Sequence, residues 1–546
     1  PLFFAPMSYN FEQLFLIFFL HARAIILKER SCNLHKRIIE QGMSAIIDTG
    51  PNTPCPQPFN LTAHVLARAD DLHDKIALSI ISPQDVDNWT FGALKSAVLG
   101  TATGLLESGL APGQKIMLRL GNTVDFPIVY LAAIAVGLHP IPLSAQLTAA
   151  ELEKLCSVVE PDAVAIDPQL DFPDSVIAKR IQLSDLKNMR SRPGATYQMG
   201  DKDRLAYLVF TSGTSGRPKA VMHAHRAVWA RQMMIDDWYD LRENDRLLHA
   251  GAFNWTYTLG TGLLDPWSIG ATALIPSGST NIEDIPFLLA EHDATIFAAA
   301  PGVFRRMLKV APFPALPMLR HGLSAGEKLS DTLRDEWRRI SNSEIYEAFG
   351  MSECSTFISS SVKAPALPET LGRPQGGRRV AILSSGTQGE LAEFGETGLI
   401  AVDRRDPGLM LGYLGEDDEH KYQGEWFLTG DLGQMYPDGS VRYMGRDDDV
   451  MTAGGYRVSP IEVEAHLLTH PRIQTVAVKD IEIKEDTRII AAFYTSETDL
   501  VETDLQDFAN AKLARYKQPR LYIRVEALPV GPNGKLLRRD LSLPKE

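Results

Sequence analysis

A run of hydroxyl-bearing residues and glycines ends in a lysine at residues 211–219, Thr-Ser-Gly-Thr-Ser-Gly-Arg-Pro-Lys. Glycines let a backbone approach a ligand closely, and the hydroxyls and free N–H groups supply many small donors. A loop of this kind suits an anion with several oxygens, such as a triphosphate. It is not the common nucleotide loop, because G-x-x-x-x-G-K-[ST] does not occur in this sequence. The alternative is a flexible Ser/Gly linker, which the strand-like segment 205–210 and the helix-like residues 227–229 disfavour.

Further motifs with chemically active residue types follow along the chain. They read Tyr-Glu-Ala-Phe-Gly-Met-Ser-Glu (346–353), Trp-Phe-Leu-Thr-Gly-Asp (426–431), Gly-Arg-Asp-Asp-Asp (445–449), Gly-Gly-Tyr-Arg (454–457) and Asn-Gly-Lys (533–535). Together with the first loop, and in this order, they resemble the motifs of the adenylate-forming superfamily, which includes acyl-CoA synthetases, the adenylation domains of peptide synthetases and luciferases. The resemblance covers roughly residues 55 to 541, which argues against chance.

The chemistry of this family starts from a carboxylic acid. A carboxylate is a poor electrophile, because its negative charge repels nucleophiles and oxide is a poor leaving group. Transfer of the acid to AMP gives a mixed anhydride, which a thiol can attack. The resemblance therefore implies an ATP-dependent acyl-CoA synthetase, an acid–thiol ligase that uses ATP and Mg²⁺ and takes coenzyme A as a substrate.

The resemblance also implies where the nucleotide binds. The hydroxyl-rich loop and Lys219 would hold the β- and γ-phosphates, and Phe349 would present an aromatic face to the adenine. Asp431 would accept both ribose hydroxyls, as a carboxylate does in other nucleotide sites, and Arg446 would donate to them. The implied nucleotide-binding residues are Thr211, Ser212, Gly213, Thr214, Ser215, Gly216, Lys219, Gly326, Glu327, Lys328, Glu347, Ala348, Phe349, Gly350, Met351, Asp431 and Arg446.

Three residues are implied to act closest to the reacting groups. Glu353 would hold Mg²⁺, a hard ion that takes oxygen ligands and bridges phosphates. Ser352 stands where the family usually has Thr and keeps the hydroxyl. Lys535, in Gly-Pro-Asn-Gly-Lys, would bridge the carboxylate and the α-phosphate as charge develops there. The alternatives are a surface glutamate and one more exposed lysine near a basic C-terminus.

The thioester step is implied to use another face of the C-terminal domain. Gly454 and Gly455 would leave a narrow channel for pantetheine, and Arg457 is placed like the family arginine that contacts the CoA phosphates. Asp448 stands at the family's hinge position, where a large φ/ψ change moves domains as rigid bodies. A plain β-turn at the glycine pair and a solvated acidic loop at 447–449 are the alternatives.

Residues 253–256 bear on which acid is used. Peptide-synthetase domains usually carry Asp after Phe here, to pair with an amino group, whereas this chain has Asn254, which disfavours amino acids. Trp255 and Gly350 are the implied acyl pocket, and Gly350 replaces a Trp that blocks the pocket of acetate-specific relatives. A medium-chain or benzoate-type acid is therefore expected. An acyl-AMP ligase that loads a carrier protein, a luciferase-like oxygenase and a catalytically silent acyl-nucleotide-binding protein are the alternatives.

Composition restricts the partners of the chain. The formal net charge of −13 over 546 residues disfavours general binding to nucleic acid or anionic membranes. An acidic ligand must then be met by local lysines and arginines. The 4 cysteines lack C-x-x-C spacing and indicate neither a disulfide framework nor a zinc site, so a reduced, cytoplasmic compartment is expected.

The elements that must position these motifs follow an α/β pattern with largely parallel sheets. Strands are expected at 116–120, 163–166, 206–210, 271–275 and 295–299, and helices at 126–136 and 150–158. After about residue 372 the strands are closely spaced and separated by Gly/Asp turns, as in the family's distorted β-barrel. They are expected at 379–383, 398–402, 426–429 and 441–444.

Three regions are expected. An atypical N-terminal extension takes residues 1–42, a large adenylation domain of two α/β subdomains plus a distorted β-barrel takes 43–446, and a small mobile α+β lid takes 447–546, with its hinge near Asp448. The apolar run 14–20 falls short of the roughly 20 residues that span a bilayer, and it lacks the preceding positive charge of a secretory signal. We expect 1–42 to be translated from upstream of the true start; a peripheral membrane anchor is the alternative.

Overall fold

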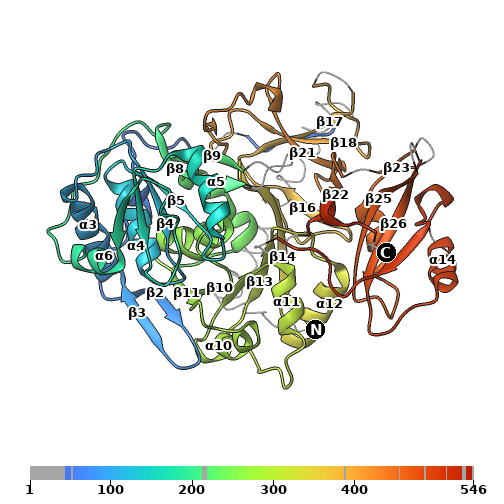
Figure 1. Cartoon of the computed structure of the whole chain (residues 1–546), viewed down its shortest axis with the longest axis horizontal. Helices are drawn as coiled ribbons and strands as arrows, with labels where there is room; N and C mark the ends of the chain where they lie inside the picture. The colour runs from blue at the N-terminus through green and yellow to red at the C-terminus, as the bar shows by residue number, and fades with distance from the viewer. Residues whose placement is uncertain are drawn as a thin grey trace, which may run out of the picture.

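The computed structural model describes residues 44–50, 53–211, 218–386, 389–449, 451–453, 456–484, 487–511, 513–531 and 536–543. Figure 1 shows a large body followed by a smaller C-terminal domain, drawn in red, at its side. The predicted extension 1–42 lies outside the described residues. So do several predicted site residues: Ser212, Gly213, Thr214, Ser215, Gly216, Gly454, Gly455 and Lys535.

One long sheet forms the spine of the large body. Its central strands are parallel and run in the order β14-β13-β12-β10-β11-β2. Apolar side chains fill both faces of these strands, as expected of a parallel sheet covered by helices. The strands are β2 (Ile76–Ile81), β10 (Arg246–His249), β11 (Thr272–Pro276), β12 (Ile296–Ala299), β13 (His321–Ala325) and β14 (Glu344–Met351).

The same sheet continues beyond β14 as antiparallel strands, in the order β15-β16-β22-β21-β18-β17-β1. This is the region where the sequence predicts a distorted barrel, and its apolar side chains form a core of their own. The strands are β1 (Ile46–Asp48), β15 (Ser355–Ser359), β16 (Thr370–Pro374), β17 (Arg379–Ser384), β18 (Thr397–Asp403), β21 (Trp426–Met435) and β22 (Val441–Arg446). The four predicted strands are all present, and β21 is longer than predicted.

A second, parallel sheet of four strands forms the other α/β part, in the order β5-β4-β6-β7. Its helix α4 (Asp125–Ala135) is buried along its whole length, which explains why the sequence there is apolar on every side. The predicted strands and helices of both α/β parts are confirmed with ends that differ by at most one residue. The elements here are β4 (Lys115–Arg119), β5 (His139–Pro142), β6 (Ala163–Ile166), β7 (Lys179–Gln182), α3 (Phe91–Glu107), α5 (Ala149–Val159) and α6 (Leu183–Met189).

The hydroxyl-rich loop joins two antiparallel strands, β8 (Leu205–Thr211) and β9 (Lys219–Ala224). Thr211 pairs directly with Lys219, so the two ends of the loop lie side by side. The predicted helical residues 227–229 are confirmed in the helix α7 (Arg226–Ala230), which follows β9. Pairing with β8 on one side and β19 (Gly412–Tyr413) on the other explains why β9 is extended.

The C-terminal domain is a small α+β unit with a separate apolar core, as predicted. A three-stranded sheet in the order β25-β26-β27 packs against two helices. Its elements are β23 (Met451–Ala453), β24 (Tyr456–Val458), α13 (Pro460–Leu467), β25 (Thr475–Lys484), β26 (Thr487–Thr495), α14 (Glu502–Asn510) and β27 (Leu521–Arg524). Within the part of the chain that the structure describes, no helix is long and apolar enough to cross a membrane.

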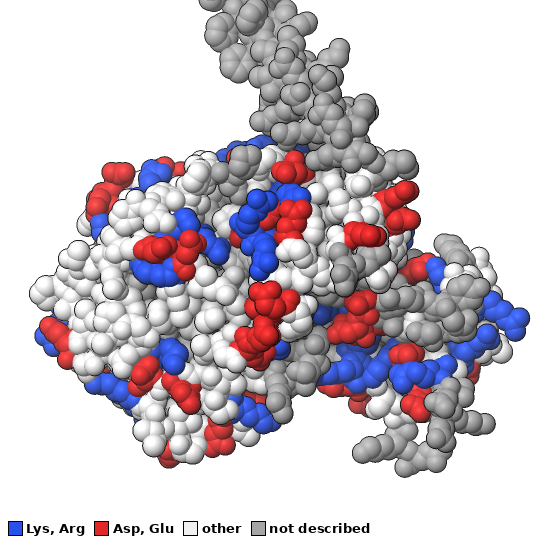
Figure 2. Space-filling view, turned by 90° about the horizontal axis from the view of Figure 1, so that it is seen from above, with Lys and Arg blue, Asp and Glu red and all other residues white. Residues whose placement is uncertain are grey.

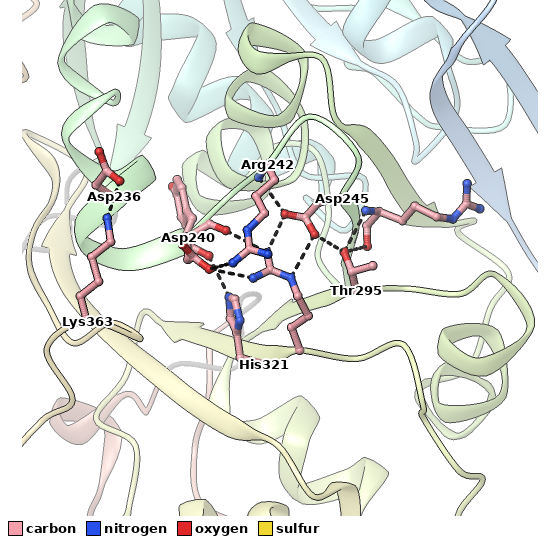
Figure 3. Close-up of polar contacts among 10 residues, drawn as sticks. Asp236, Asp240, Arg242, Asp245, Thr295, His321 and Lys363 are labelled. Carbon is pink, nitrogen blue, oxygen red and sulfur yellow. Dashed lines mark hydrogen bonds and ion pairs between the residues drawn. The ribbon is translucent and has the colours of Figure 1, made fainter. Parts of the chain in front are cut away.

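Polar side chains fasten the amino ends of the central strands (Figure 3). Asp245, Thr295 and Arg320 directly precede β10, β12 and β13. Arg320 Nη2 lies 2.6 Å from Asp245 Oδ2, and Thr295 Oγ1 donates to Asp245 Oδ1 at 2.7 Å. Arg320 also pairs with Asp240 at 2.8 Å. These contacts hold the amino ends of the strands in register. The candidate site lies at the opposite, carboxyl ends.

Candidate active site

Several of the predicted site residues lie at the carboxyl ends of the parallel strands. Trp255 lies beyond the end of β10, segment 326–328 follows β13, and Ser352 and Glu353 directly follow β14. Since β13 and β14 are neighbours and β10 lies two strands beyond β13 in the same parallel sheet, these segments lie at one edge of the sheet. In open α/β sheets, ligands bind outside this edge.

Glu353 stands in the short turn between β14 and β15, and only 9% of its surface is exposed. The hydroxyl of Tyr413 donates a 2.7 Å hydrogen bond to Oε1 of Glu353. Burial, followed by the neighbouring carboxylate of Glu353, raises the pKa of Tyr413, which keeps the phenol protonated as a donor. Nothing in the local sequence marks Tyr413, because it reaches Glu353 only through the pairing of β19 with β9.

Tyr413 also connects Glu353 to the lysine of the phosphate loop. Lys219 Nζ lies 4.7 Å from the centroid of the Tyr413 ring and 2.5 Å from Oε2 of Glu416. On the other side of the turn, His223 of β9 contacts the carbonyl of Ser352 at 2.7 Å. The turn that carries Glu353 and the strand that carries Lys219 are thus held together by two separate contacts.

The carboxylate of Glu353 suits a magnesium ion bound mainly through substrate oxygens. Mg²⁺ commonly uses one or two carboxylates together with phosphates and water. Among the described residues there is no cluster of three or more His, Cys, Asp or Glu side chains that could hold a metal alone. A single oriented carboxylate, connected through Tyr413 to Lys219, fits an ion that would arrive with a nucleotide.

Asp431 and Arg446 form the predicted ribose contact, and the structure brings them together. Asp431 of β21 pairs with Arg446 of β22 in the strand register, and Arg446 Nη1 lies 3.2 Å from Asp431 Oδ2. The hydroxyl of Tyr443 donates to Asp431 Oδ1 at 2.9 Å, and its ring lies 5.5 Å from that of Phe349. Tyr443, which no sequence motif marks, thus connects the predicted adenine and ribose contacts.

Arg446 links the ribose side of the site to the predicted hinge. Its Nε lies 3.2 Å from Oδ1 of Asp448, and its Nη1 contacts Asp431. Burial acts to lower the pKa of Arg446, but the two carboxylates outweigh it and raise the pKa, so the guanidinium stays charged. One side chain therefore contacts both the predicted ribose carboxylate and the predicted hinge residue.

Gly326 is required by its contact with Trp255. Its φ is +96°, and a Cβ built on it would lie 2.7 Å from Cζ2 of Trp255. The indole also meets the ring of Tyr257 edge-on at 5.1 Å. The predicted adenine segment, where Gly326 is exposed and Glu327 and Lys328 are half-buried, is therefore in contact with the predicted acyl residue.

Glu347 has a role in the scaffold that the sequence did not reveal. Its buried carboxylate accepts from the backbone N–H of Leu329 at 2.8 Å and pairs with Arg334 at 3.1 Å. Burial raises the pKa of Glu347 to about 7, against the opposing effect of Arg334. The carboxylate is engaged within the scaffold, and the backbone N–H and carbonyl of Glu347 are paired with Ser360, so its contact with adenine stays a prediction.

The expectation that Gly350 leaves open volume in the acyl pocket is wrong in its physical basis. A Cβ built on Gly350 would lie 2.1 Å from the carbonyl oxygen of Ser355 and 2.5 Å from Cα of Thr356. Backbone of β15, rather than open space, fills the direction in which a side chain would point. Glycine is needed here because the two strands approach closely at a register shift.

For the remaining predicted residues the structure gives only their places in strands. Thr211 ends β8, Lys219 begins β9, and Ala348 and Met351 lie in β14. Arg457 lies in β24, although its side chain is outside the described part. The roles of Gly454, Gly455 and Lys535, which lie outside the described residues, stay predictions.

Comparison with known proteins agrees with this geometry. Residues 66–414 match the family model of the AMP-binding enzyme, and residues 462–535 match the AMP-binding enzyme C-terminal domain. An uncharacterized acyl–CoA ligase of Bacillus subtilis (strain 168) is 27% identical over 83% of this chain and 90% of its own length. A 4-hydroxybenzoate–CoA/benzoate–CoA ligase of Rhodopseudomonas palustris is 28% identical over 85% of this chain and 91% of its own.

A solved structure supports the fold. The anthranilate CoA ligase AuaEII in complex with anthranoyl-AMP superposes with a TM-score of 0.81 at 23% identity, over 89% of this chain and 96% of that one. At this identity the match shows the shared architecture of a large N-terminal and a small C-terminal domain. The family predicted from the sequence motifs is confirmed: the chain belongs to the AMP-binding enzyme family.

Proposed function

We propose that this chain is an ATP-dependent acyl-CoA synthetase that activates a medium-chain or aromatic carboxylic acid through an acyl-AMP intermediate. The observation that carries the proposal is the arrangement around Tyr413, whose hydroxyl binds the carboxylate of Glu353 while the ammonium of Lys219 lies over its ring. A carboxylate for a metal and a cation for phosphates, both beside the phosphate loop, are the groups that a metal–triphosphate complex needs.

In the first half-reaction a carboxylate oxygen of the acid attacks the α-phosphorus of ATP, and pyrophosphate leaves. Lys219 and the loop before it bind the departing phosphates, and Asp431 and Arg446 fix the ribose. Mg²⁺, when bound, neutralises phosphate charge, and Glu353 is the residue that would hold it. Lys535 would stabilise the charge that develops between the carboxylate and the α-phosphate.

In the second half-reaction the CoA thiolate attacks the acyl carbon, and AMP leaves. Gly454 and Gly455 would admit the pantetheine arm, and Arg457 would bind CoA phosphate. The C-terminal domain would turn about Asp448 between the two steps. The contact between Arg446 and Asp448 offers a physical link between an occupied ribose site and this hinge.

The preference for a medium-chain or aromatic acid rests on the residues around Trp255. The ring of Tyr257 meets the indole of Trp255 edge-on at 5.1 Å and stacks on the buried Trp238 at 5.8 Å. Trp255 itself is half-buried, so its indole offers an apolar surface to an acyl group, and the ligases named for 4-hydroxybenzoate, benzoate and anthranilate act on aromatic acids.

Surface charge and the cysteines support small-molecule partners and a reduced compartment for this chain. On the face shown in Figure 2, acidic and basic side chains of the described residues are interspersed rather than gathered into one basic field. This agrees with small-molecule substrates rather than nucleic acid as partners. The described cysteines Cys55, Cys156 and Cys354 are free thiols, which fits the reduced cytoplasm.

The test is a pyrophosphate-release screen across straight-chain and aromatic acids, with and without CoA. We expect acid-dependent pyrophosphate release in both arms, and acyl-CoA with AMP only when CoA is present. Acyl-AMP that accumulates and does not react with CoA would favour a ligase that loads a carrier protein. Failure of every acid to stimulate pyrophosphate release would refute the proposed activity.

A further inference from the structure

The turn that carries Glu353 ends on a serine in an unusual backbone conformation. Ser355 begins β15 opposite Met351 and has a φ of +62°, in the left-handed region that favours glycine. Hairpin connections of this length commonly place a glycine at their left-handed position. A serine there is strained, and strain in a native structure is retained where surrounding contacts over-determine the conformation.

The contact that holds Ser355 comes from a buried arginine. Arg231 Nη1 donates to the hydroxyl of Ser355. The rest of the guanidinium forms a bidentate pair with Asp265, with Nε–Oδ1 at 2.8 Å and Nη2–Oδ2 at 2.6 Å. Tyr239 donates to the same carboxylate at 2.7 Å. Because Asp265 and Tyr239 fix the guanidinium from the other side, its position is set independently of the turn.

Arg231 also touches the segment that follows Trp255. The helix α8 (Thr256–Leu259) continues directly into the π-helix η2 (Gly260–Leu264). A Cβ built on Gly260 would lie 2.3 Å from Cζ of Arg231, so only glycine permits this approach. Thr261 accepts from Arg231 Nη2 at 3.3 Å. π-Helical turns within helices occur frequently at functional sites.

On the other side of the turn, Ser355 lies against Gly350. Its carbonyl oxygen occupies the space beside Gly350, where a Cβ would come within 2.1 Å. The left-handed conformation of Ser355 therefore fixes how closely β15 approaches β14 at the base of the turn. Any relaxation of Ser355 would shift the residues that precede it, including Glu353.

We propose that Ser355 and Arg231 are positioning residues, which hold the turn bearing Glu353 in fixed register with the acyl-side helix that starts after Trp255. The inference rests on the proposed function, because Glu353 acts as a metal ligand only within it. In this arrangement the hydrogen bond of the Ser355 hydroxyl to Arg231 offsets the backbone strain at Ser355. Because the buried guanidinium also contacts η2, it fixes the position of the turn relative to η2.

Two substitutions separate positioning from stability. Ser355→Ala removes the hydroxyl and keeps the strain, whereas Ser355→Gly removes the hydroxyl and relieves the strain. We expect Ser355→Ala to lower Tm and Ser355→Gly to leave Tm unchanged or raise it. Both should weaken equilibrium binding of Mn²⁺ with ATP, measured on the full chain by the electron paramagnetic resonance of Mn²⁺, by roughly 10-fold, the usual scale for losing a group that orients a metal ligand.

A purely structural role predicts a different pattern. Binding of Mn²⁺ with ATP would then follow Tm, so that Ser355→Gly binds as tightly as the unmodified chain, and this result would overturn the inference. Asn342→Gly is the matched control, because Asn342 also has a left-handed φ of +55° but ends helix α12 (Asp331–Ser341), away from the turn. It should change Tm without changing Mn²⁺ binding.

Glu353→Gln distinguishes failure of this inference from failure of the proposed function. If Glu353→Gln abolishes Mn²⁺ binding with ATP while both serine variants bind normally, only the positioning role is lost. If Glu353→Gln binds Mn²⁺ with ATP normally, the metal role of Glu353 is wrong and the inference falls with it.

Discussion

Tyr413 and Glu353 are 60 residues apart in the sequence, yet the phenol donates a 2.7 Å hydrogen bond to the carboxylate. Tyr413→Phe should remove this bond and keep the ring beneath Lys219. We expect kcat/KM for Mg²⁺–ATP to fall roughly 10-fold, because the carboxylate loses its orienting donor. Steady-state kinetics at varied Mg²⁺–ATP measure this. Tyr436→Phe, which removes a longer bond of 3.3 Å to Gln434, is the control and should have no effect on this constant.

Lys219 and Glu416 form an ion pair of 2.5 Å at the end of the phosphate loop. If Lys219 must leave this pair to bind phosphate, Glu416→Gln should lower KM for ATP. The pair is partly exposed, so about 0.5–1 kcal/mol, or a two- to fivefold change, is expected. Glu419→Gln, at an exposed glutamate three residues further along the chain, is the control. A higher KM for ATP in Glu416→Gln would mean that Glu416 assists nucleotide binding instead of competing with it.

Lys535 should act in only one half-reaction. Lys535→Ala is expected to reduce acid-dependent pyrophosphate release by roughly 10²-fold or more, the scale for losing one preorganised group at the developing charge. The variant should still convert supplied acyl-AMP to acyl-CoA, which a thioester assay measures. Equal losses in both half-reactions would show that this lysine is not specific to adenylation.

Asp448 combines a predicted hinge with an ion pair to Arg446, at 3.2 Å. Asp448→Pro should fix φ and trap one domain orientation, so that adenylation and thioester formation are slowed very unequally. Asp448→Asn removes the ion pair but leaves the backbone free, and it should slow neither step by more than a few-fold. Identical behaviour of the two variants would assign the effect to charge rather than to hinge motion.

The cluster at the amino ends of the central strands should carry stability rather than activity. Asp245 is only 2% exposed, and its carboxylate accepts hydrogen bonds from Arg320, Thr295 and the backbone N–H of Arg242 (Figure 3). Asp245→Asn should lower the free energy of unfolding by about 2 kcal/mol, because it removes the charge from the hydrogen bonds to Arg320, which keeps only its pair with Asp240. Asp236→Asn, which breaks the exposed pair with Lys363, should cost less than about 1 kcal/mol. Denaturant unfolding distinguishes them.

The sequence alone determined the family and most of the elements. The motifs at 211–219, 346–353 and 426–431 depend on local residue order, and a helix such as α4 is apolar along its whole length whatever its neighbours are. Strand β6 was predicted with its true ends for the same reason, since four consecutive apolar residues followed by a turn indicate a buried strand. Such signals are contained within a few neighbouring residues.

The tertiary structure decided what the local sequence does not contain. Strand β9 is extended because β8 and β19 pair with it, Tyr413 reaches Glu353 through that pairing, and Tyr443 joins Asp431 to Phe349 across separate strands. Gly350 is a glycine because β15 backbone lies against it, not because a pocket is open. These contacts join residues far apart in the chain, and each depends on strand register, which the packing of the whole sheet selects.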